Sequence, residues 1–361
     1  MLKSEIAVAK SILMVGPSPG ARGGVASVCS TYLHSGLLSR LNIIYLVSFK
    51  SGSQSTKIVV AIAALAKAWQ LCAKRIVTVV HVHVATNMSF WRKALFYLPA
   101  RMYRIPYVLH LHSGDMPAFL QRSTRLQRRI ILGLMRRAAA VVVLSPEWAE
   151  WVHSVCPQAQ VEILPNPVVV PESRPAARTA EPSLLFLGRL TPEKGFPELL
   201  QALSIVRERH PDAVLYAGGE GDMDSVRRLV GQLGLQDAVR FLGWVDGDRK
   251  TQLLSSCWIF CLPSHHEGLP VGVLEAMAHA MPFVATPVGG LPGLVRESGG
   301  GRIVPIDAPQ LLANALLSLL ENPADRMLLG DNGWRHAKSF FSIEVIESRL
   351  RTIYSGLPQR A

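Results

Sequence analysis

The stretch IFCLPSHHEGLPVGVLEAMAHA, residues 259–280, contains the pattern that decides the fold. Ile259–Leu262 is a short apolar run typical of a buried parallel strand, and Val271–Ala280 has the length and apolar content of a helix. Between them lies a polar loop that contains Glu267 and Gly268. A strand, a polar loop and a helix in this order are typical of a βα unit, whose loop lies at the carboxyl edge of a sheet.

The same alternation continues on both sides of this stretch. Short apolar runs predict strands, and longer segments with helical spacing, such as Glu198–Arg209, follow them. The predicted strands are Ser11–Val15, Ile43–Val47, Val77–Val84, Tyr107–Leu111, Ala140–Leu144, Leu184–Leu187, Ala213–Ala217, Val239–Leu242, Ile259–Leu262 and Phe283–Ala285. Residues 168–183, VVVPESRPAARTAEPS, are rich in proline, alanine and charge, which is typical of a linker between domains.

At about 150 residues per domain, a chain of 361 residues suggests two domains. We therefore predict two Rossmann-like, doubly wound α/β domains that face each other across a cleft. The first is expected over residues 1–170 and the second over residues 171–335. A C-terminal helix within residues 336–361 is expected to pack back on the first domain.

Composition excludes several classes of protein. With 49% hydrophobic and 18% charged residues, the chain is not disordered. Its five cysteines are an odd number, scattered and without a Cys-x-x-Cys pair, so we expect no disulfide framework or structural zinc and a reducing cytoplasm. Residues 1–10 do not resemble a signal peptide. The most apolar stretch, Ile58–Ala73, contains Lys67 and falls short of the roughly 20 residues of a membrane span.

Charge is unevenly distributed along the chain. Residues 1–170 carry 19 Lys and Arg against 5 Asp and Glu, a net charge of +14, and the remainder carries −2. Between Ser89 and Arg137 basic residues alternate with aromatic ones, which favours adsorption to an anionic bilayer. The residues expected to bind the membrane or acceptor there are Arg128, Arg129, Arg136 and Arg137. A nucleic-acid partner is not expected, because no nucleic-acid-binding module is legible; a basic face that only aids solubility stays open.

Two loops carry residue types that suit an anionic ligand. The Gly16–Gly24 loop places adjacent glycines, Gly23 and Gly24, before a helix, where backbone amides can approach an anion. Arg189 and Lys194 share one loop, which suits clamping a diphosphate from two sides. Taken alone, these features also fit a plain tight turn and a surface salt bridge.

Glu267 and Glu275 form the most informative pair. Glu267 precedes a helix whose amides would point at an anion, and Glu275 lies about 12 Å further along at 1.5 Å per residue. The two carboxylates can accept hydrogen bonds from hydroxyls at two ends of an elongated ligand, with phosphates between them on the amides. An ordinary acidic helix start followed by an exposed glutamate is the alternative.

Together these stretches resemble the retaining GT-B glycosyltransferases of family 4, in which a Glu-x7-Glu motif binds the donor sugar and the ribose. Further stretches match in order and spacing: Ile163–Pro167, Gly188–Gly195, Ala217–Gly221 and Ala285–Gly293. The resemblance covers residues 11–24 and nearly all of residues 163–300. It implies that the first domain binds the acceptor and the second binds a nucleoside-diphosphate sugar.

The resemblance also implies roles for single residues. Arg189 and Lys194 would hold the donor diphosphate, Glu267 would contact the sugar, and Glu275 would bind the ribose. His112 would contact the donor from the first domain, although Ser113 stands where the family often has Gly or Asp. The remaining donor-binding residues would be Gly24, Gly218, Glu220, Gly268, Leu269, Pro270 and Val271, and those near the acceptor Gly23 and Asp115.

A metal ion is not expected. In Asp222-Met-Asp224 the first aspartate precedes a helical segment and is interpreted as an N-cap. His81-Val-His83 and His265-His266 are not accompanied by a cluster of carboxylate or cysteine ligands, and His110 is interpreted as a buried core residue. No cofactor is expected either, because the nucleotide sugar is a co-substrate.

We therefore expect a retaining hexosyltransferase that moves a hexose to a lipid-linked saccharide acceptor in exopolysaccharide or lipopolysaccharide biosynthesis. It would be cytoplasmic and peripheral on the inner face of the cell membrane. The resemblance implies same-face attack in which a donor phosphate oxygen takes the acceptor proton, with Asp115 as an alternative base. A GT-B sugar-nucleotide epimerase or hydrolase, and a nucleic-acid-binding protein, are the alternatives. Uridine and guanosine both stay open as the donor nucleoside.

Overall fold

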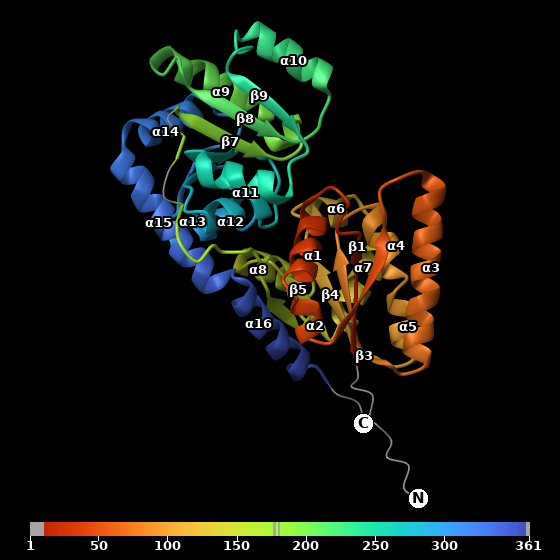
Figure 1. The fold of residues 1–361 in the computed structure, drawn as a ribbon. Helices are drawn as coiled ribbons and strands as arrows, with labels where there is room; N and C mark the ends of the chain where they lie inside the picture. The colour runs from red at the N-terminus through yellow and green to blue at the C-terminus, as the bar shows by residue number, and fades with distance from the viewer. Residues whose placement is uncertain (1–10, 176–177, 180, 359–361) are drawn as a thin grey trace, which may run out of the picture. The chain divides into compact units, whose positions relative to one another are not determined.

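The computed structural model describes residues 11–175, 178–179 and 181–358, and Figure 1 shows its course. The expectation about a signal peptide concerns residues 1–10, which lie outside the described residues. The chain divides into two compact units. Unit 1 runs to Pro167 and resumes at Ile343, and unit 2 comprises Val168–Ser342.

Unit 1 contains a six-stranded parallel sheet in the order β2-β1-β3-β4-β5-β6. The five strands expected in this part of the sequence are confirmed, with ends that differ by a residue or two. A sixth, β6, was not predicted, because its three residues are too short and too polar to show a pattern. The strands are β1 (Ser11–Pro17), β2 (Ile43–Phe49), β3 (Val77–Val84), β4 (Tyr107–Leu111), β5 (Ala140–Val143) and β6 (Val161–Ile163).

Helices cover both faces of this sheet. The main apolar core lies under helices α3 to α8, with side chains such as Phe90, Met116 and Ile131 fully buried against the strands. The opposite face lies against α1 and α16, where Tyr32 contacts His83 and Tyr354 contacts His81. The helices are α1 (Gly24–His34), α2 (Leu37–Arg40), α3 (Gln54–Ala73), α4 (Met88–Ala94), α5 (Tyr97–Met102), α6 (Met116–Arg122), α7 (Arg125–Arg137), α8 (Pro146–Val155) and α16 (Ile343–Gly356).

Helix α3 corrects one expectation about length. It has 20 residues, because it begins at Gln54 under a Ser53 cap rather than at Ile58. By length and composition alone it could cross a membrane, although core helices of soluble proteins pass the same test. Ala68 and Leu71 are buried in the core of unit 1, so one side of α3 belongs to this domain.

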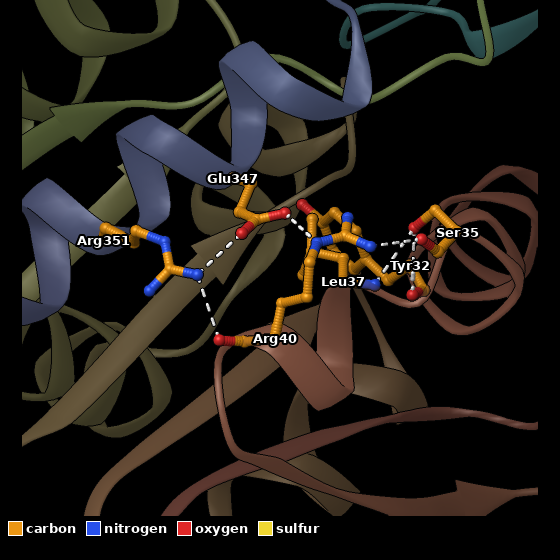
Figure 2. Close-up of polar contacts among 6 residues, drawn as sticks. All are labelled: Tyr32, Ser35, Leu37, Arg40, Glu347 and Arg351. Atoms are coloured by element: carbon orange, nitrogen blue, oxygen red, sulfur yellow. Dashed lines mark hydrogen bonds and ion pairs between the residues drawn. The ribbon is translucent and has the colours of Figure 1, made fainter.

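Helix α16 returns from the end of unit 2 and belongs to unit 1. Its Glu347 accepts hydrogen bonds from Arg40 at the end of α2 (2.6 Å) and from Arg351 one turn further along α16 (2.7 Å), as Figure 2 shows. Arg351 also donates to the backbone carbonyl of Arg40. On its buried side, Tyr354 Oη lies 2.7 Å from His81 Nδ1. Polar contacts at two points therefore join α16 to the sheet and to α2.

Unit 2 contains the second parallel sheet, in the order β12-β11-β10-β7-β8-β9. The five strands predicted for this part are confirmed, and β12 was missed for the same reason as β6. The strands are β7 (Ser183–Leu187), β8 (Val214–Gly218), β9 (Val239–Gly243), β10 (Ile259–Leu262), β11 (Phe283–Ala285) and β12 (Gly301–Ile303). The helices are η1 (Pro192–Lys194), α9 (Phe196–Arg209), α10 (Met223–Gln232), α11 (Gly247–Ser256), α12 (Val271–Ala278), α13 (Leu291–Ser298), α14 (Pro309–Glu321) and α15 (Pro323–Phe340).

The proline-rich segment that precedes β7 is tied to unit 2. Arg178 donates hydrogen bonds of 2.8–2.9 Å to four backbone carbonyls at the ends of α11 and α12. Burial lowers the pKa of Arg178 to about 10, which still leaves its guanidinium charged at neutral pH. Residues 176, 177 and 180 of the expected linker lie outside the described residues.

Candidate active site

The strand orders locate where each sheet can bind a ligand. In a doubly wound sheet, ligands bind at the carboxyl edge, where the strand order reverses. In unit 2 the reversal lies between β7 and β10, and in unit 1 it lies between β1 and β3. The loops after β7 and β10 contain Arg189, Lys194 and Glu267, so the expected donor motifs of unit 2 fall at its reversal point.

Lys194 and Glu267 meet across these two loops. Lys194 Nζ lies 2.5 Å from Glu267 Oε1, and the two side chains are 22% and 11% exposed. Both are therefore partly withdrawn from water, where an ion pair is screened less than at the surface. The ammonium of Lys194 keeps two further N–H donors besides the one used by Glu267.

Glu275 has a lysine partner that the sequence did not reveal. Lys250, in the middle of α11, lies 2.6 Å from Glu275 Oε1 on α12, with exposed fractions of 22% and 16%. Each carboxylate of the Glu-x7-Glu pair is thus bound to one lysine. Lys250 belongs to no glycine-rich or strand-exit motif, so only the packing of α11 beside α12 identifies it.

Glycines bring the loops together. Gly195 has a positive φ of 65°, and a side chain there would meet the Pro263 carbonyl at 1.9 Å. Gly289 also has a positive φ, and a side chain there would meet the carbonyl oxygens of Glu267 and Gly268 at 2.3 Å. The Lys194 loop and the loop after β11 can therefore both lie against the Glu267 loop.

The residues between Glu267 and Glu275 can bind a ligand through their backbone amides. The side chains of Leu269 and Val271 are buried, and α12 starts at Val271 without a side-chain cap. Amides of a helix's first turn have no partner inside the helix and attract anions. Pro270 has no N–H, and the amides of Val273 and Leu274 donate to the Pro270 carbonyl, so the amides in question are those of Val271 and Gly272.

The remaining sites of unit 2 are placed as follows. Arg189 lies two residues after the end of β7 and is exposed, and Gly218 ends β8 with Glu220 two residues later. Leu190 N donates to Glu220 O at 2.9 Å, so the β7 and β8 exits are held side by side. Asp222 accepts a hydrogen bond from Ser225 N, which confirms its interpretation as a helix N-cap.

In unit 1 the glycine loop lies at the reversal point. Gly23 has a φ of 126° and precedes α1, whose first residue is Gly24, and both glycines are exposed. The first turn of α1 has neither a side-chain cap nor an acidic residue. This helix start is therefore available to an anion, as the sequence suggested. Asp115 lies after β4 and forms an ion pair of 2.8 Å with Arg122.

His112 follows β4 and belongs to a cluster of four imidazoles. His83 Nδ1 lies 2.7 Å from His112 Nε2, and His81 Nε2 lies 3.1 Å from His110 Nδ1. The rings of His110 and His112 are 4.0 Å apart. The interpretation of His110 as a buried residue is confirmed, and His81 and His83 are equally buried.

Burial keeps this cluster uncharged. Loss of hydration lowers the pKa of His81 and of His112 to about 3, and those of His83 and His110 fall well below the ordinary value. The ammonium of Lys93, which donates to the His83 carbonyl, lowers the pKa of His83 and His112 further. At neutral pH the four rings are therefore neutral.

Two groups of side chains come close enough together to consider a metal ion. They are His81 with His83 and His110, and Glu198 with His265 and Asp307. In the first group one nitrogen of His81 already bonds to His110, and the nearby Lys93 ammonium opposes a second cation. The second group is partly exposed.

Comparison with known proteins decides the family. The model for Glycosyltransferase Family 4 matches residues 28–172, and that for Glycosyl transferases group 1 matches residues 172–336. The phosphatidyl-myo-inositol mannosyltransferase of Mycobacterium tuberculosis is 30% identical over 265 residues, 68% of each chain. The chain belongs to glycosyltransferase family 4. It is therefore a glycosyltransferase, as the motifs predicted.

Other known proteins resemble this chain in sequence or in fold. The alpha-D-kanosaminyltransferase of Streptomyces kanamyceticus is 26% identical over 288 residues, 72% of each chain. Sucrose-phosphate synthase from Thermosynechococcus elongatus superposes with a TM-score of 0.79 at 19% identity, covering 96% of this chain and 99% of that one. HepE of Anabaena, in complex with UDP-glucose, superposes with a TM-score of 0.74 at 18% identity, covering 96% of this chain and 100% of that one. These structures confirm the GT-B fold of the transferase.

Proposed function

We propose that this transferase moves a hexose from a nucleoside-diphosphate sugar to a lipid-linked saccharide, with retention at the anomeric carbon. The observation that carries the proposal is the pair of Lys–Glu contacts at the reversal point of unit 2, next to the start of α12. Lysines and helix amides suit a diphosphate, and glutamates suit the hydroxyls of the sugar and ribose.

The chemical requirement is stabilisation of negative charge. As the bond from the anomeric carbon to the donor oxygen breaks, charge grows on the leaving diphosphate. In the proposed complex Lys194 and Arg189 bind the diphosphate, and the first amides of α12 complete the site. Glu267 then binds the sugar and Glu275 the ribose, while Gly24 offers amides from unit 1.

Retention is proposed to proceed by same-face attack. A retaining glycosidase needs one carboxylic acid and one carboxylate nucleophile about 5–5.5 Å apart. Here the carboxylates of Glu267 and Glu275 are each bound to a lysine, so we assign neither of them the role of acid or nucleophile. A donor phosphate oxygen is the base we propose for the acceptor proton. Asp115 is the weaker candidate, since Arg122 binds it.

The proposed acceptor is attached to an anionic membrane, which unit 1 would contact from the cytoplasmic side. Helix α3 exposes Ile58, Val59 and Ile62 to 58–64%, which leaves an apolar strip without a protein partner among the described residues. Asp115 is the sole acidic residue between residues 6 and 146. Apolar side chains surrounded by positive charge suit an anionic bilayer surface. Such an acceptor fits exopolysaccharide or lipopolysaccharide assembly.

Helix α7 adds to this support. Leu126 and Ile130 are exposed on it, and the arginines at 128, 129, 136 and 137 are exposed on the same helix. A capping box at Thr124 fixes where the helix begins. The basic side chains are thus held on a regular element rather than on a loop.

A transfer assay with defined lipids tests the function. Purified protein is incubated with UDP- and GDP-hexoses and polyprenyl-diphosphate-linked saccharides in the presence of EDTA, and the product is analysed by NMR. We expect a glycolipid with the donor's anomeric configuration and full activity in EDTA, since no metal or further cofactor is proposed. An inverted product contradicts retention, and loss of activity in EDTA contradicts metal independence. Release of free sugar without lipid favours a hydrolase.

A further inference from the structure

The histidine cluster of unit 1 contains a hydrogen bond between His83 and His112 that has no role in the reaction proposed above. His112 is the residue of this cluster assigned to the donor, and this inference rests on that proposed role. Its backbone N–H donates to Val84 O at 2.9 Å, which continues the β3–β4 ladder by one residue. The hydrogen bond to β3 thus fixes the position of the His112 main chain. The ring of His112 contacts the ring of another residue of β3.

That residue is His83. In the parallel register His83 lies opposite His110, so the side chain of His83 reaches forward to His112. The end of β3 is itself fixed, because the buried Lys93 of α4 donates to the His83 carbonyl. The ring of His112 lies close to His110 and forms hydrogen bonds with His83 and with the side chain of Asn166. Rotation of the His112 ring would break the contact with His83 inside a packed core.

The contact also assigns the protons. Both rings are neutral, so each carries one N–H, and the 2.7 Å contact needs one donor and one acceptor. His83 Nε2 is buried without a hydrogen-bond partner among the described residues. A buried N–H without a partner is costly, so the hydrogen of His83 belongs on Nδ1, where it is donated to His112. His112 Nε2 then accepts, and its own hydrogen lies on Nδ1.

We infer that His83 is a positioning residue for the transfer reaction: it donates from Nδ1 to His112 Nε2 and thereby holds His112 as the Nδ1–H tautomer in one orientation. His83 itself does not need to touch the substrate. Its effect is exerted through His112. The contact of His112 with the nucleotide sugar depends on which ring nitrogen carries the hydrogen and on the orientation of the ring.

The chain offers a conservative variant and a matched control. In His83→Asn the side-chain amide can place an N–H near the former Nδ1 position, whereas His83→Leu removes the donor. His81→Leu is the control, because His81 is equally buried on the same strand but bonds to Tyr354 and His110. Both leucine variants remove a buried ring, so a merely structural role predicts the same effect for both.

The first measurement is kinetic. We expect His83→Leu to lower kcat about 10- to 100-fold with the KM for the donor changed less, since a small misplacement of a reacting group has effects of this size. His83→Asn should restore most of kcat, and His81→Leu should leave it within about threefold. Equal losses in His83→Leu and His81→Leu, or no recovery in His83→Asn, overturn the inference.

The second measurement is spectroscopic and needs no turnover. Long-range ¹H–¹⁵N correlation spectra of the full chain with labelled histidine report which ring nitrogen bears hydrogen, and His112→Ala assigns the His112 signals. The Nδ1–H tautomer of His112 is expected in the wild type and in His83→Asn, with a mixture in His83→Leu. An Nε2–H tautomer in the wild type overturns the inference. If His112→Ala leaves transfer unchanged, the proposed role of His112 fails, and the positioning role fails with it.

Discussion

The two units share a sheet architecture but place their charges differently. At its reversal point unit 2 pairs full charges, with Lys194 bound to Glu267 and Lys250 to Glu275 nearby. Unit 1 holds four neutral imidazoles in its interior beside the single buried ammonium of Lys93, and the other basic residues named above lie on its surface. The difference fits the proposed roles, in which unit 2 binds an anionic donor at the edge of its sheet and unit 1 is attracted to an anionic surface.

The largest expected effect concerns the surface of unit 1. Replacing Arg128, Arg129, Arg136 and Arg137 by glutamine removes four positive charges, each contributing about 1 kcal/mol near an anionic membrane. At low salt the partition onto phosphatidylglycerol vesicles should fall by up to about a thousandfold. Sedimentation with vesicles measures this, and circular dichroism checks that α7 stays folded.

A charge-matched variant of unit 2 is the control for this prediction. Arg227, Arg228, Arg240 and Arg249 are exposed there, and their replacement by glutamine changes the net charge by the same amount. Vesicle binding of this variant should stay close to that of the wild type. Equal weakening in both variants would show that net charge alone, rather than the face of unit 1, determines binding.

The next largest effect concerns the site of unit 2. Lys194→Ala removes a cation from the diphosphate site and should lower kcat by about 10²–10³, or 2.7–4 kcal/mol, by analogy with loss of one oxyanion-hole donor. It also leaves Glu267 without the lysine that now binds it. Lys338→Ala, at an exposed lysine on α15, should leave transfer unchanged. Wild-type turnover of the donor by Lys194→Ala contradicts the diphosphate role.

The two units also differ in how much of each could be predicted from the sequence. The strands and the Glu-x7-Glu motif of unit 2 were legible, because a βα unit places its ligand residues in a short local stretch. Lys250 was not, since it reaches Glu275 only through the packing of α11 beside α12. The strands β6 and β12 have three residues each, too few for a periodic pattern.

In unit 1 the sequence predicted the histidine cluster only in part. His81-Val-His83 and His110-Leu-His112 each place two rings on one face of a strand, as an alternating pattern requires. That the two pairs meet depends on β3 and β4 being neighbours in a given register, which composition does not encode. Likewise the length of α3 was underestimated, because the polar residues before Ile58 hid its first turn.

A smaller effect is expected when the pH is lowered, because the four buried histidines of unit 1 are neutral in the folded state. The pKa values of His81 and His112 are lowered to about 3 from an ordinary value of 6.5, so the unfolded chain binds more protons below pH 6.5. The stability that depends on these rings is therefore full above pH 6.5 and falls as the pH is lowered toward 3. Between pH 7.5 and 5.5 each of these two groups should lower the free energy of unfolding by about 1.4 kcal/mol. His83 and His110 add to this loss, because burial lowers their pKa values as well.

Hydrogen exchange of the β3 and β4 amides at pH 7.5 and 5.5 measures this effect separately from unit 2. The pKa of Lys93 is lowered to about 8, so its titration lies above this pH window. The His81→Leu variant lacks one of the four titrating rings and should therefore lose about 1.4 kcal/mol less stability over the same interval. An opening free energy of β3 that does not change between the two pH values contradicts the buried neutral cluster.

The smallest effect concerns a place where unit 1 does pair its surface charges. Burial alone would raise the pKa of Glu347, but hydrogen bonds from Arg351 and Arg40 outweigh it, so the pKa lies below its ordinary value of 4.5. The stability from this group is therefore present above pH 4.5 and is lost as the pH falls below it. Both arginines are about half exposed, so Glu347→Gln should cost only about 1 kcal/mol at pH 7.

A double-mutant cycle with Arg40→Gln isolates the contact that joins α16 to α2 (Figure 2). Urea unfolding at pH 7 should give a coupling energy of about 0.2–1 kcal/mol, which shrinks in 1 M salt because the arginine is open to solvent. The cycle with Arg351→Gln stays within α16 and should give a value at the lower end of this range. If neither cycle shows coupling at low salt, the attachment of α16 depends on its apolar face, on the Tyr354–His81 contact and on the hydrogen bond from Arg351 to the Arg40 carbonyl.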